Sequence, residues 1–429
     1  MLLQRKIGLG GALLLGLGSI IGTGLFLSLG LAANITGTYF ILALLAAGFV
    51  ALCNALNSAQ LASLYPTSGG AYEYGYQLLH PHAGFTAGFS FLVAKSASAA
   101  SATLGLAFAL QKFLNVDALP IALTVLLCTT VCAALGLKKS NFVNTVILFF
   151  VLTPLFLLIT MGCYSLSTTP SSFSILTQLQ NETFSIPNFL QATAILFVAY
   201  TGYGRIATLG EEVLDPKKTI PRSIILTLAT TLVLYLGIAV VLTKGLGTKN
   251  LQTSTLSQHI PVVDLAQHFQ MPTLAMALTL AASLSLVSVL LNLILGLSRM
   301  LLAMARRGDA PQFLQKLSPQ NANPTRAVLT VGMGIGCLIL TLGFSKNWSV
   351  SAFSILIYYA VVNAAALKIK KPQRLYPSWL AACGLLFCCV LAYFIEMQVW
   401  LVGTIILLVA NGIKLYQSTK LRNFLARLG

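Results

Sequence analysis

Apolar residues fill long continuous stretches of this chain, and short polar or glycine-rich segments separate them. Each stretch is about 20 residues long, which is the length that an α-helix needs to cross the hydrocarbon core of a bilayer. The pattern predicts an all-α, polytopic membrane protein with about twelve transmembrane helices. We expect these spans at residues 7–32, 38–62, 85–112, 118–137, 142–164, 188–213, 222–243, 272–303, 327–344, 350–368, 377–396 and 399–416.

Two of the predicted spans carry glycine clusters where an unbroken helix is expected. Gly18, Gly22 and Gly24 lie close together in the first span, and Gly202 and Gly204 lie in the sixth. Lipid offers no hydrogen-bond partner to a freed backbone, so an interruption at this depth is stable only beside a protein-lined cavity. Many transporters build their substrate site from helices that are broken near the bilayer midplane. The pattern therefore predicts that helices one and six are broken.

The positions of these two spans predict an internal symmetry. Helix six starts five spans after helix one, so it enters the membrane from the opposite face. This arrangement is typical of two inverted five-helix repeats with breaks at matching positions. We expect the first repeat at residues 7–164, the second, inverted repeat at 188–368, and two accessory helices at 377–416.

Composition and charge agree with a membrane protein. Hydrophobic residues make up 57% of the chain and charged residues 8%, whereas roughly a quarter of the residues in a soluble protein are charged. The net charge is +17, and 19 of the 26 Lys and Arg residues fall in inner loops and tails if the N-terminus is inside. The positive-inside rule then places both termini in the cytoplasm. The basic residues therefore indicate topology and contact with anionic membrane lipid, and not a nucleic-acid surface.

We accordingly expect an integral protein of the plasma (cell inner) membrane. The sequence leaves the oligomeric state open.

Several motifs resemble a known family, and they occur in order over the first 311 residues. Residues 18–26 resemble the first-helix signature of the amino acid–polyamine–organocation (APC) transporter superfamily, and residues 66–72 resemble its loop between helices two and three. Residues 200–222 are similar to its sixth helix and the following loop, and residues 299–311 to the exit of its eighth helix. The resemblance implies an amino acid permease, and it implies that Phe197 forms an aromatic lid over the bound substrate.

An interrupted helix offers backbone groups that suit a zwitterion. The amides at the start of the second half of helix one favour a carboxylate, and the carbonyls freed in helix six suit an ammonium group. Glycine lets a ligand approach the backbone closely. The alternative is that these glycines only allow close helix packing. The predicted substrate-binding residues are Ser19, Ile20, Ile21, Gly22, Thr23, Gly24, Phe197, Ala199, Tyr200, Thr201, Gly202 and Tyr203.

Two basic residues at membrane depth extend this prediction. An ionisable group inside the membrane is a functional hypothesis by default. Lys95 is interpreted as a proton-coupling group or as a fixed cation in place of sodium. The alternative is a lysine that reaches the inner surface or is bonded to backbone carbonyls. Arg205 follows the second break directly. It either contacts an acidic group of the substrate or forms an inner ion-pair gate with Glu211 and Glu212.

The remaining residues point to transport rather than catalysis. No histidine clusters with a cysteine, so we expect no metal site, no catalytic residues and no cofactor. A proton gradient or exchange would drive transport, although the hydroxyls of Ser283, Ser285 and Ser288 leave sodium possible. The leading prediction is a secondary active transporter that moves an amino acid by alternating access. The alternative is a non-transporting amino acid sensor or a channel-like protein on the same scaffold.

Overall fold

The described part of the chain is built from helices. The structure, a computed structural model, describes residues 7–65, 69–136, 141–168, 175–207, 213–318 and 323–425 of the 429-residue chain. Within these ranges the extended pairing is limited to one isolated bridge between Ile7 and Val213. The predicted all-α fold class is therefore confirmed.

The helices follow one another with short connections. Those of the first half are α1 (Leu9–Ile20), the π-helix η1 (Gly24–Ser28), α2 (Leu29–Thr36), the 3₁₀ turn η2 (Gly37–Tyr39), α3 (Phe40–Leu64), α4 (Ala71–Tyr74), η3 (Gly75–Leu79), α5 (Pro81–Leu114), α6 (Ala118–Ala134), α7 (Asn141–Thr168) and α8 (Ile175–Asn181). Those of the second half are α9 (Ile186–Tyr200), the 3₁₀ turn η4 (Thr201–Tyr203), α10 (Gly204–Ala207), α11 (Pro216–Leu256), α12 (Pro261–His268), α13 (Pro272–Arg307), η5 (Gln312–Gln315), α14 (Thr325–Thr341), α15 (Phe344–Leu367), η6 (Lys371–Gln373), α16 (Ser378–Tyr393) and α17 (Met397–Leu425).

Seven helical stretches in the described ranges are long and apolar enough to cross a membrane, judged by length and composition. They are Gly24–Leu64, Pro81–Gln111, Val143–Ser165, Pro216–Leu256, Pro272–Arg307, Phe344–Leu367 and Met397–Tyr416. The shorter helices α1, α6, α14 and α16 are also apolar. This number differs from the predicted twelve partly because the turn η2 keeps the chain helical, so one stretch covers the end of the first predicted span and the whole of the second. The two interruptions also leave α1 and α9 too short to count as spans.

The first predicted interruption is a true break in the helix. Helix α1 ends at Ile20, and Ile21 takes an extended conformation with φ −75° and ψ 105°. The chain then re-enters a helical path at Thr23 and continues through η1 into α2. The glycine-rich sequence of the first span thus divides it into two half-helices.

The second predicted interruption has a different form. Helix α9 ends at Tyr200, and the chain passes through the turn η4 into α10. A 3₁₀ turn is narrower than an α-helix and shifts the hydrogen bonds by one residue. The backbone here is tightened rather than extended, so it frees fewer carbonyl groups than the unwound segment that the sequence predicts.

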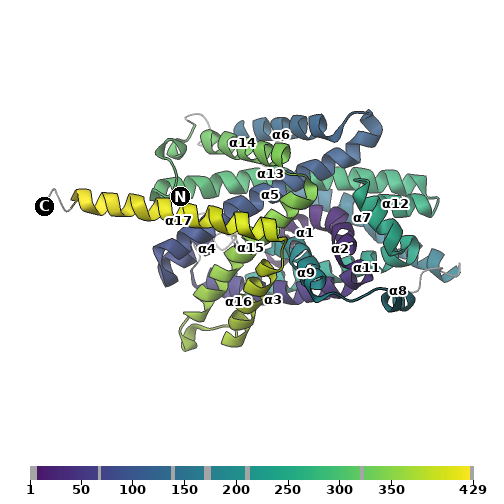
Figure 1. The fold of residues 1–429 in the computed structure, drawn as a ribbon, viewed down its shortest axis with the longest axis horizontal. Helices are drawn as coiled ribbons and strands as arrows, with labels where there is room; N and C mark the ends of the chain where they lie inside the picture. Colours follow the sequence, from purple (N-terminus) through teal and green to yellow (C-terminus); the bar gives the residue numbers. More distant parts are fainter. Residues whose placement is uncertain are drawn as a thin grey trace.

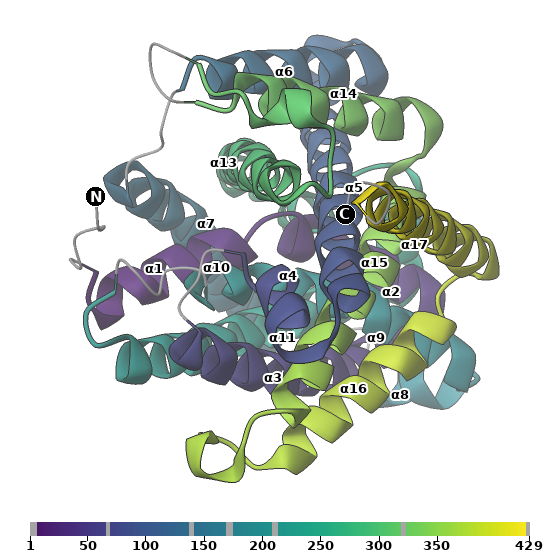
Figure 2. The same ribbon diagram turned by 90° about the vertical axis from the view of Figure 1, so that its left-hand side faces the viewer.

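The long helix α5 runs through the centre of the molecule and packs against α13 and α15 (Figures 1 and 2). Helices α6 and α14 lie side by side on one flank, and on the other α3 packs against both α9 and α11. Helix α17 lies at the edge and extends beyond the bundle (Figure 1). Of the two interrupted helices, α9 is buried from Ala192 to Tyr200, and α1 is buried along the face of Ala12, Gly16, Leu17 and Ile20.

A cluster of charged and aromatic side chains ties one end of α13 to the α4–η3 segment and to α17. This Asp309 cluster consists of Tyr72, Glu73, Tyr76, Arg307, Asp309 and Lys414. Asp309 accepts hydrogen bonds from Tyr72 Oη at 2.6 Å and from Tyr76 Oη at 2.5 Å, and it lies 2.8 Å from Lys414 Nζ. Burial, with the bond to Asp309, raises the pKa of Tyr72, so its phenol stays protonated and keeps donating.

Candidate functional site

A cavity of about 500 Å³ lies between α1, α5, η4, α10, α13 and α15. This volume falls within the range of roughly 300–1,000 Å³ that is usual for small-molecule pockets. The cavity wall brings together five of the predicted site residues: Ser19, Lys95, Thr201, Gly202 and Arg205. The cavity therefore reaches both interrupted helices.

The two interrupted helices also touch each other directly. A Cβ atom added to Gly24 would lie 2.6 Å from Ala199 Cβ and 2.8 Å from Ala199 Cα. A Cβ atom added to Gly202 would clash with the backbone carbonyl of Ser19. Both glycines are therefore required for close approach of the backbones, as the packing alternative predicts. This role does not conflict with a binding role, because Gly202 also faces the cavity.

Hydroxyl groups cap the carbonyls around the break. Tyr235 Oη lies within hydrogen-bond distance of the carbonyls of Ile20 (3.2 Å) and Ala199 (3.3 Å). Ser285 Oγ donates to the carbonyl of Ile21 at 2.6 Å. Among the helix-six carbonyls predicted to accept from an ammonium group, that of Ala199 thus already has a partner. The sequence analysis missed Tyr235, because an isolated tyrosine in an apolar helix gives no signal of its own.

The segment after the break is buried behind the cavity wall. Residues Ile20 to Gly24 are buried, and they do not contribute to the cavity lining. The Gly22 carbonyl accepts from the amides of Leu25 (3.0 Å) and Phe26 (3.1 Å). The Thr23 hydroxyl is buried and has no hydrogen-bond partner among the described residues. The first amides of a helical segment have no intrahelical acceptor, so they are available to an anion.

Lys95 connects the central helix to the second interruption. Its Nζ donates to Thr201 Oγ1 at 3.1 Å, and Thr201 Oγ1 donates to the Val198 carbonyl at 2.8 Å. Lys95 therefore points into the cavity wall at the turn η4 and not toward an end of α5. Arg205 lines the same cavity. Its predicted gate partners, Glu211 and Glu212, lie outside the described residues, as do residues 66–68 of the loop motif.

The predicted aromatic residues are buried, and they do not line this cavity. The rings of Phe197 and Tyr203 each lie 5.6 Å from the ring of Tyr359, measured between centroids. The ring of Tyr200 lies 5.4 Å from that of Tyr235, and its hydroxyl donates to the Leu44 carbonyl at 3.3 Å. Tyr359 lines the cavity, and Phe197 packs behind the ring of Tyr359.

Several lining residues were absent from the predicted site. They are Phe91, Asn292, Arg299, Arg306, Tyr358 and Tyr359. Asn292 and Arg299 interrupt the apolar run of α13, and such polar positions inside a predicted span are a signal that could have found them. Tyr358 and Tyr359 gave no comparable signal, because two adjacent aromatic residues are compatible with any membrane helix.

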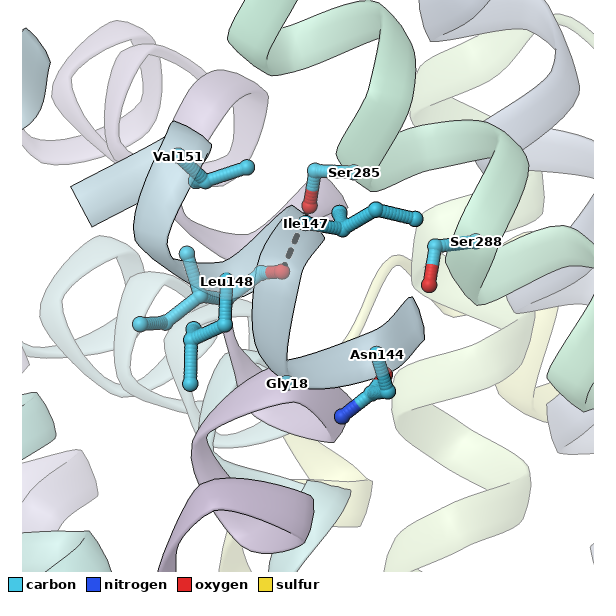
Figure 3. Close-up of a pocket in the computed structure, with 8 residues that line it drawn as sticks. Gly18, Asn144, Ile147, Leu148, Val151, Ser285 and Ser288 are labelled. Carbon is cyan, nitrogen blue, oxygen red and sulfur yellow. Dashed lines mark hydrogen bonds between the residues drawn. The ribbon is translucent and has the colours of Figure 1, made fainter. Parts of the chain in front are cut away.

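A second, much smaller cavity of about 10 Å³ lies between α1, α7 and α13. Figure 3 shows Ser285 and Ser288 on α13 facing Gly18 and Asn144 across it. Gly18 is close-packed here, because a Cβ atom on it would lie 2.6 Å from Asn144 Nδ2. A space of this size holds about one water molecule. Two of the three helix-eight serines that leave sodium possible, Ser285 and Ser288, thus line this cavity, and Ser283 does not.

Comparison with known proteins gives consistent matches over almost the whole chain. Residues 11–424 match the amino acid permease family. An uncharacterized transporter of Mycobacterium tuberculosis is 36% identical over 409 residues, covering 94% of this chain and 89% of the relative. The branched-chain amino acid permease BcaP of Bacillus subtilis is 25% identical, covering 86% and 82%. The vacuolar cationic amino acid transporter 4 of Arabidopsis thaliana is 23% identical, covering 86% and 64%.

Proposed function

Because this chain belongs to the amino acid permease family of the APC superfamily, we propose that it is a secondary active transporter that moves an amino acid by alternating access. The family and the relatives are transporters and permeases, so the chain is a membrane transporter and not an enzyme. The main observation that supports amino acid transport by alternating access is the cavity of about 500 Å³, whose wall includes residues of both interrupted helices.

The proposed membrane architecture has twelve spans. Residues 7–164 and 188–368 would form two inverted five-helix repeats, with residues 377–416 as accessory helices. The interruptions at Ile21 and at η4 support this arrangement, because they fall in the first and sixth proposed spans. The charge asymmetry supports cytoplasmic termini. The proposed location is the plasma (cell inner) membrane.

Substrate binding is proposed to use the first break and the turn η4 together. The amides around Gly22 and Thr23 would hold the α-carboxylate, and the carbonyl of Ala199 would accept from the α-ammonium. A carbonyl oxygen has two lone pairs, so the bond from Tyr235 leaves room for a second donor. The contact between Gly24 and Ala199 closes the space between these amides and the Ala199 carbonyl. Substrate would therefore enter from the cavity as the two interrupted helices move apart.

The coupling step is proposed to involve protons or exchange. Lys95 is the candidate coupling residue, because it is an intramembrane cation bonded to a residue of η4. Loss or gain of its proton would change its bond to Thr201 and so bias the contact between α5 and the interrupted helix. Sodium is the weaker proposal. The small cavity has suitable oxygen atoms, yet the Ser285 hydroxyl already donates to the Ile21 carbonyl.

Uptake into proteoliposomes tests the proposed function. Purified protein should give saturable uptake of at least one radiolabelled amino acid, and an inward proton gradient or an internal counter-substrate should accelerate it. Replacing external sodium with choline should leave the rate unchanged if protons or exchange drive transport. Protein-free liposomes and liposomes carrying a protonophore are the controls.

The alternatives give different results in the same assay. A sensor would show an amino acid–dependent rise in thermal stability without any uptake, because a ligand that binds the folded state stabilises it. A channel-like protein would pass amino acids without saturation and without counterflow. Either result would overturn the proposal.

A further inference from the structure

All of the charged side chains that the structure describes on the wall of the large cavity are basic. They are Lys95, Arg205, Arg299 and Arg306, and the described lining includes neither aspartate nor glutamate. Lys95 lies at the turn η4, and Arg299 and Arg306 lie on α13. Seven residues are about two helical turns, so these two arginines share a face of α13 about 10 Å apart. Positive charge thus lines the cavity over much of its length.

Carboxylates in the described chain do not pair with three of these basic residues, namely Lys95, Arg299 and Arg306. Asp309 pairs with Lys414, Glu73 with Arg307, and Asp215 with Lys218. Among the described residues, none of these acids forms an ion pair with Lys95, Arg299 or Arg306, and no other acid does so within 4.0 Å. Lys95, Arg299 and Arg306 are therefore distinct from the basic residues that pair with these acids.

A cavity lined by one sign of charge selects its solute electrostatically. Low-dielectric walls focus the field and raise the local concentration of the opposite charge. A neutral amino acid gains little from this field, and a cationic amino acid is repelled. An amino acid with a side-chain carboxylate carries a net negative charge, so it is attracted into the cavity before any specific contact forms.

Lys95 lies where such a carboxylate would arrive. An ammonium group has three hydrogens to donate, and Thr201 accepts one of them at 3.1 Å. Two donors remain for an anion beside the turn η4. Charge-assisted hydrogen bonds of this kind are about twice as strong as neutral ones. Ser19 and Gly202, which line the same part of the wall, belong to the proposed substrate site.

We infer that the transported solute is an anionic amino acid, such as glutamate or aspartate, and that Lys95 binds its side-chain carboxylate. Arg299 and Arg306 attract the solute along the wall of the cavity. This inference rests on the proposed transport function and names the substrate class of the same site.

Counterflow in proteoliposomes, without a pH gradient, separates substrate recognition from proton coupling. Liposomes loaded with unlabelled glutamate or aspartate should take up the labelled amino acid, and external leucine or arginine should compete at least about tenfold less well. Preference for leucine or arginine over both acidic amino acids would overturn the inference and leave the transport function intact. Lack of exchange of any amino acid would instead overturn the transport function.

Three variants test the role of Lys95. Lys95→Met should raise the half-saturation concentration for glutamate at least about tenfold, because a charge-assisted bond is lost. Lys95→Arg should keep most of the preference for acidic over neutral amino acids. Lys346→Met is the matched control, because Lys346 is exposed and does not line the cavity. It should leave the half-saturation concentration unchanged.

A thermal-shift measurement controls for misfolding of the variants. Each variant should unfold near the temperature of the parent protein without ligand, whereas the stabilisation by glutamate should be lost only in Lys95→Met. Glutamate transport by Lys95→Met with an unchanged half-saturation concentration would rule out Lys95 as the carboxylate ligand.

Discussion

The residue at position 24 determines how closely the interrupted helices approach. Gly24 lies against the side chain and the Cα atom of Ala199, so the neighbour cannot give way by rotating a flexible group. Interior packing in proteins is dense, and an added methyl group must displace backbone at such a contact. Close packing at Gly24 therefore couples the first half of the chain to the second.

Gly24→Ala is expected to destabilise the protein. Overpacking of a well-packed contact costs roughly 1–3 kcal/mol, which exceeds the gain of about 0.5–1 kcal/mol from Gly to Ala in a helix. The thermal unfolding midpoint in detergent should fall. The matched control is Gly334→Ala on α14, where a Cβ atom meets nothing within 4 Å and stability should rise slightly. Equal midpoints for the two variants would contradict the packing argument.

Ser285 stabilises the broken backbone of helix one. Its hydroxyl donates to the buried carbonyl of Ile21, which lost its helical partner at the break. Ser285→Ala should destabilise the protein by about 1–3 kcal/mol, because it leaves a buried acceptor unsatisfied. Ser283→Ala is the control, since Ser283 Oγ donates only within its own helix, to the Thr279 carbonyl at 2.9 Å. A denaturation midpoint that falls equally for both would show that the cross-helix bond contributes nothing.

The sequence predicted some site residues and missed others for a physical reason. Lys95 and Gly202 were found because a charge or a glycine is unusual inside an apolar span, and Thr201 was found because it precedes Gly202. Tyr235 and Tyr359 were missed, since their roles depend on where α11 and α15 cross the interrupted helices. A crossing point is set by packing across the whole bundle, and hydropathy along one helix carries no information about it.

At the scale of elements, the Asp309 cluster fixes the position of α17. The most apolar window of this helix is not buried within the protein, so apolar packing inside the protein contributes little to its position. Its Lys414 reaches Asp309, and both side chains are largely buried, at 15% and 8% exposure. Asp309 also accepts from two tyrosines of the α4–η3 segment. One carboxylate thus joins three separate elements.

Asp309→Asn should loosen α17. Removing one partner of a buried ion pair costs roughly 3 kcal/mol, because the other charge is left without compensation. Hydrogen–deuterium exchange should rise in α17 and at η3, and the unfolding midpoint should fall. Asp215→Asn is the control, since Asp215 and Lys218 are 3.7 Å apart and mostly exposed. Such a pair contributes at most about 1 kcal/mol. Unchanged exchange in α17 would contradict the anchoring role.

The elements themselves were largely predictable, and their boundaries were not. Long apolar runs predicted α5, α13 and α15, because a helix satisfies the hydrogen bonds of all its backbone N–H and C=O groups within lipid. The glycines of the first span gave the break at Ile21. The form of the second interruption was not predictable, because Thr201 and Tyr203 can adopt either a 3₁₀ turn or extended backbone. The sequence also does not show that Gly202 packs against the Ser19 carbonyl.

At the scale of the whole molecule, the proposed topology depends on the short helix α14. It has 17 residues and spans about 26 Å, slightly less than the bilayer core of about 30 Å. If α14 crosses the membrane, Ala303 on α13 and Lys346 on α15 lie on opposite sides. The positive-inside rule places Ala303, on the cavity wall near Arg306, toward the cytoplasm.

Cysteine labelling tests this arrangement directly. In a background where the exposed native cysteines are replaced by serine, Ala303→Cys should react with a membrane-impermeant maleimide in inside-out vesicles and not in intact cells. Lys346→Cys should show the opposite pattern, and both should react in detergent. Labelling of both from one side would mean that α14 does not cross, and the second five-helix repeat would then be lost. Opposite labelling with the sides exchanged would preserve the repeat and reverse the direction in which the basic cavity opens.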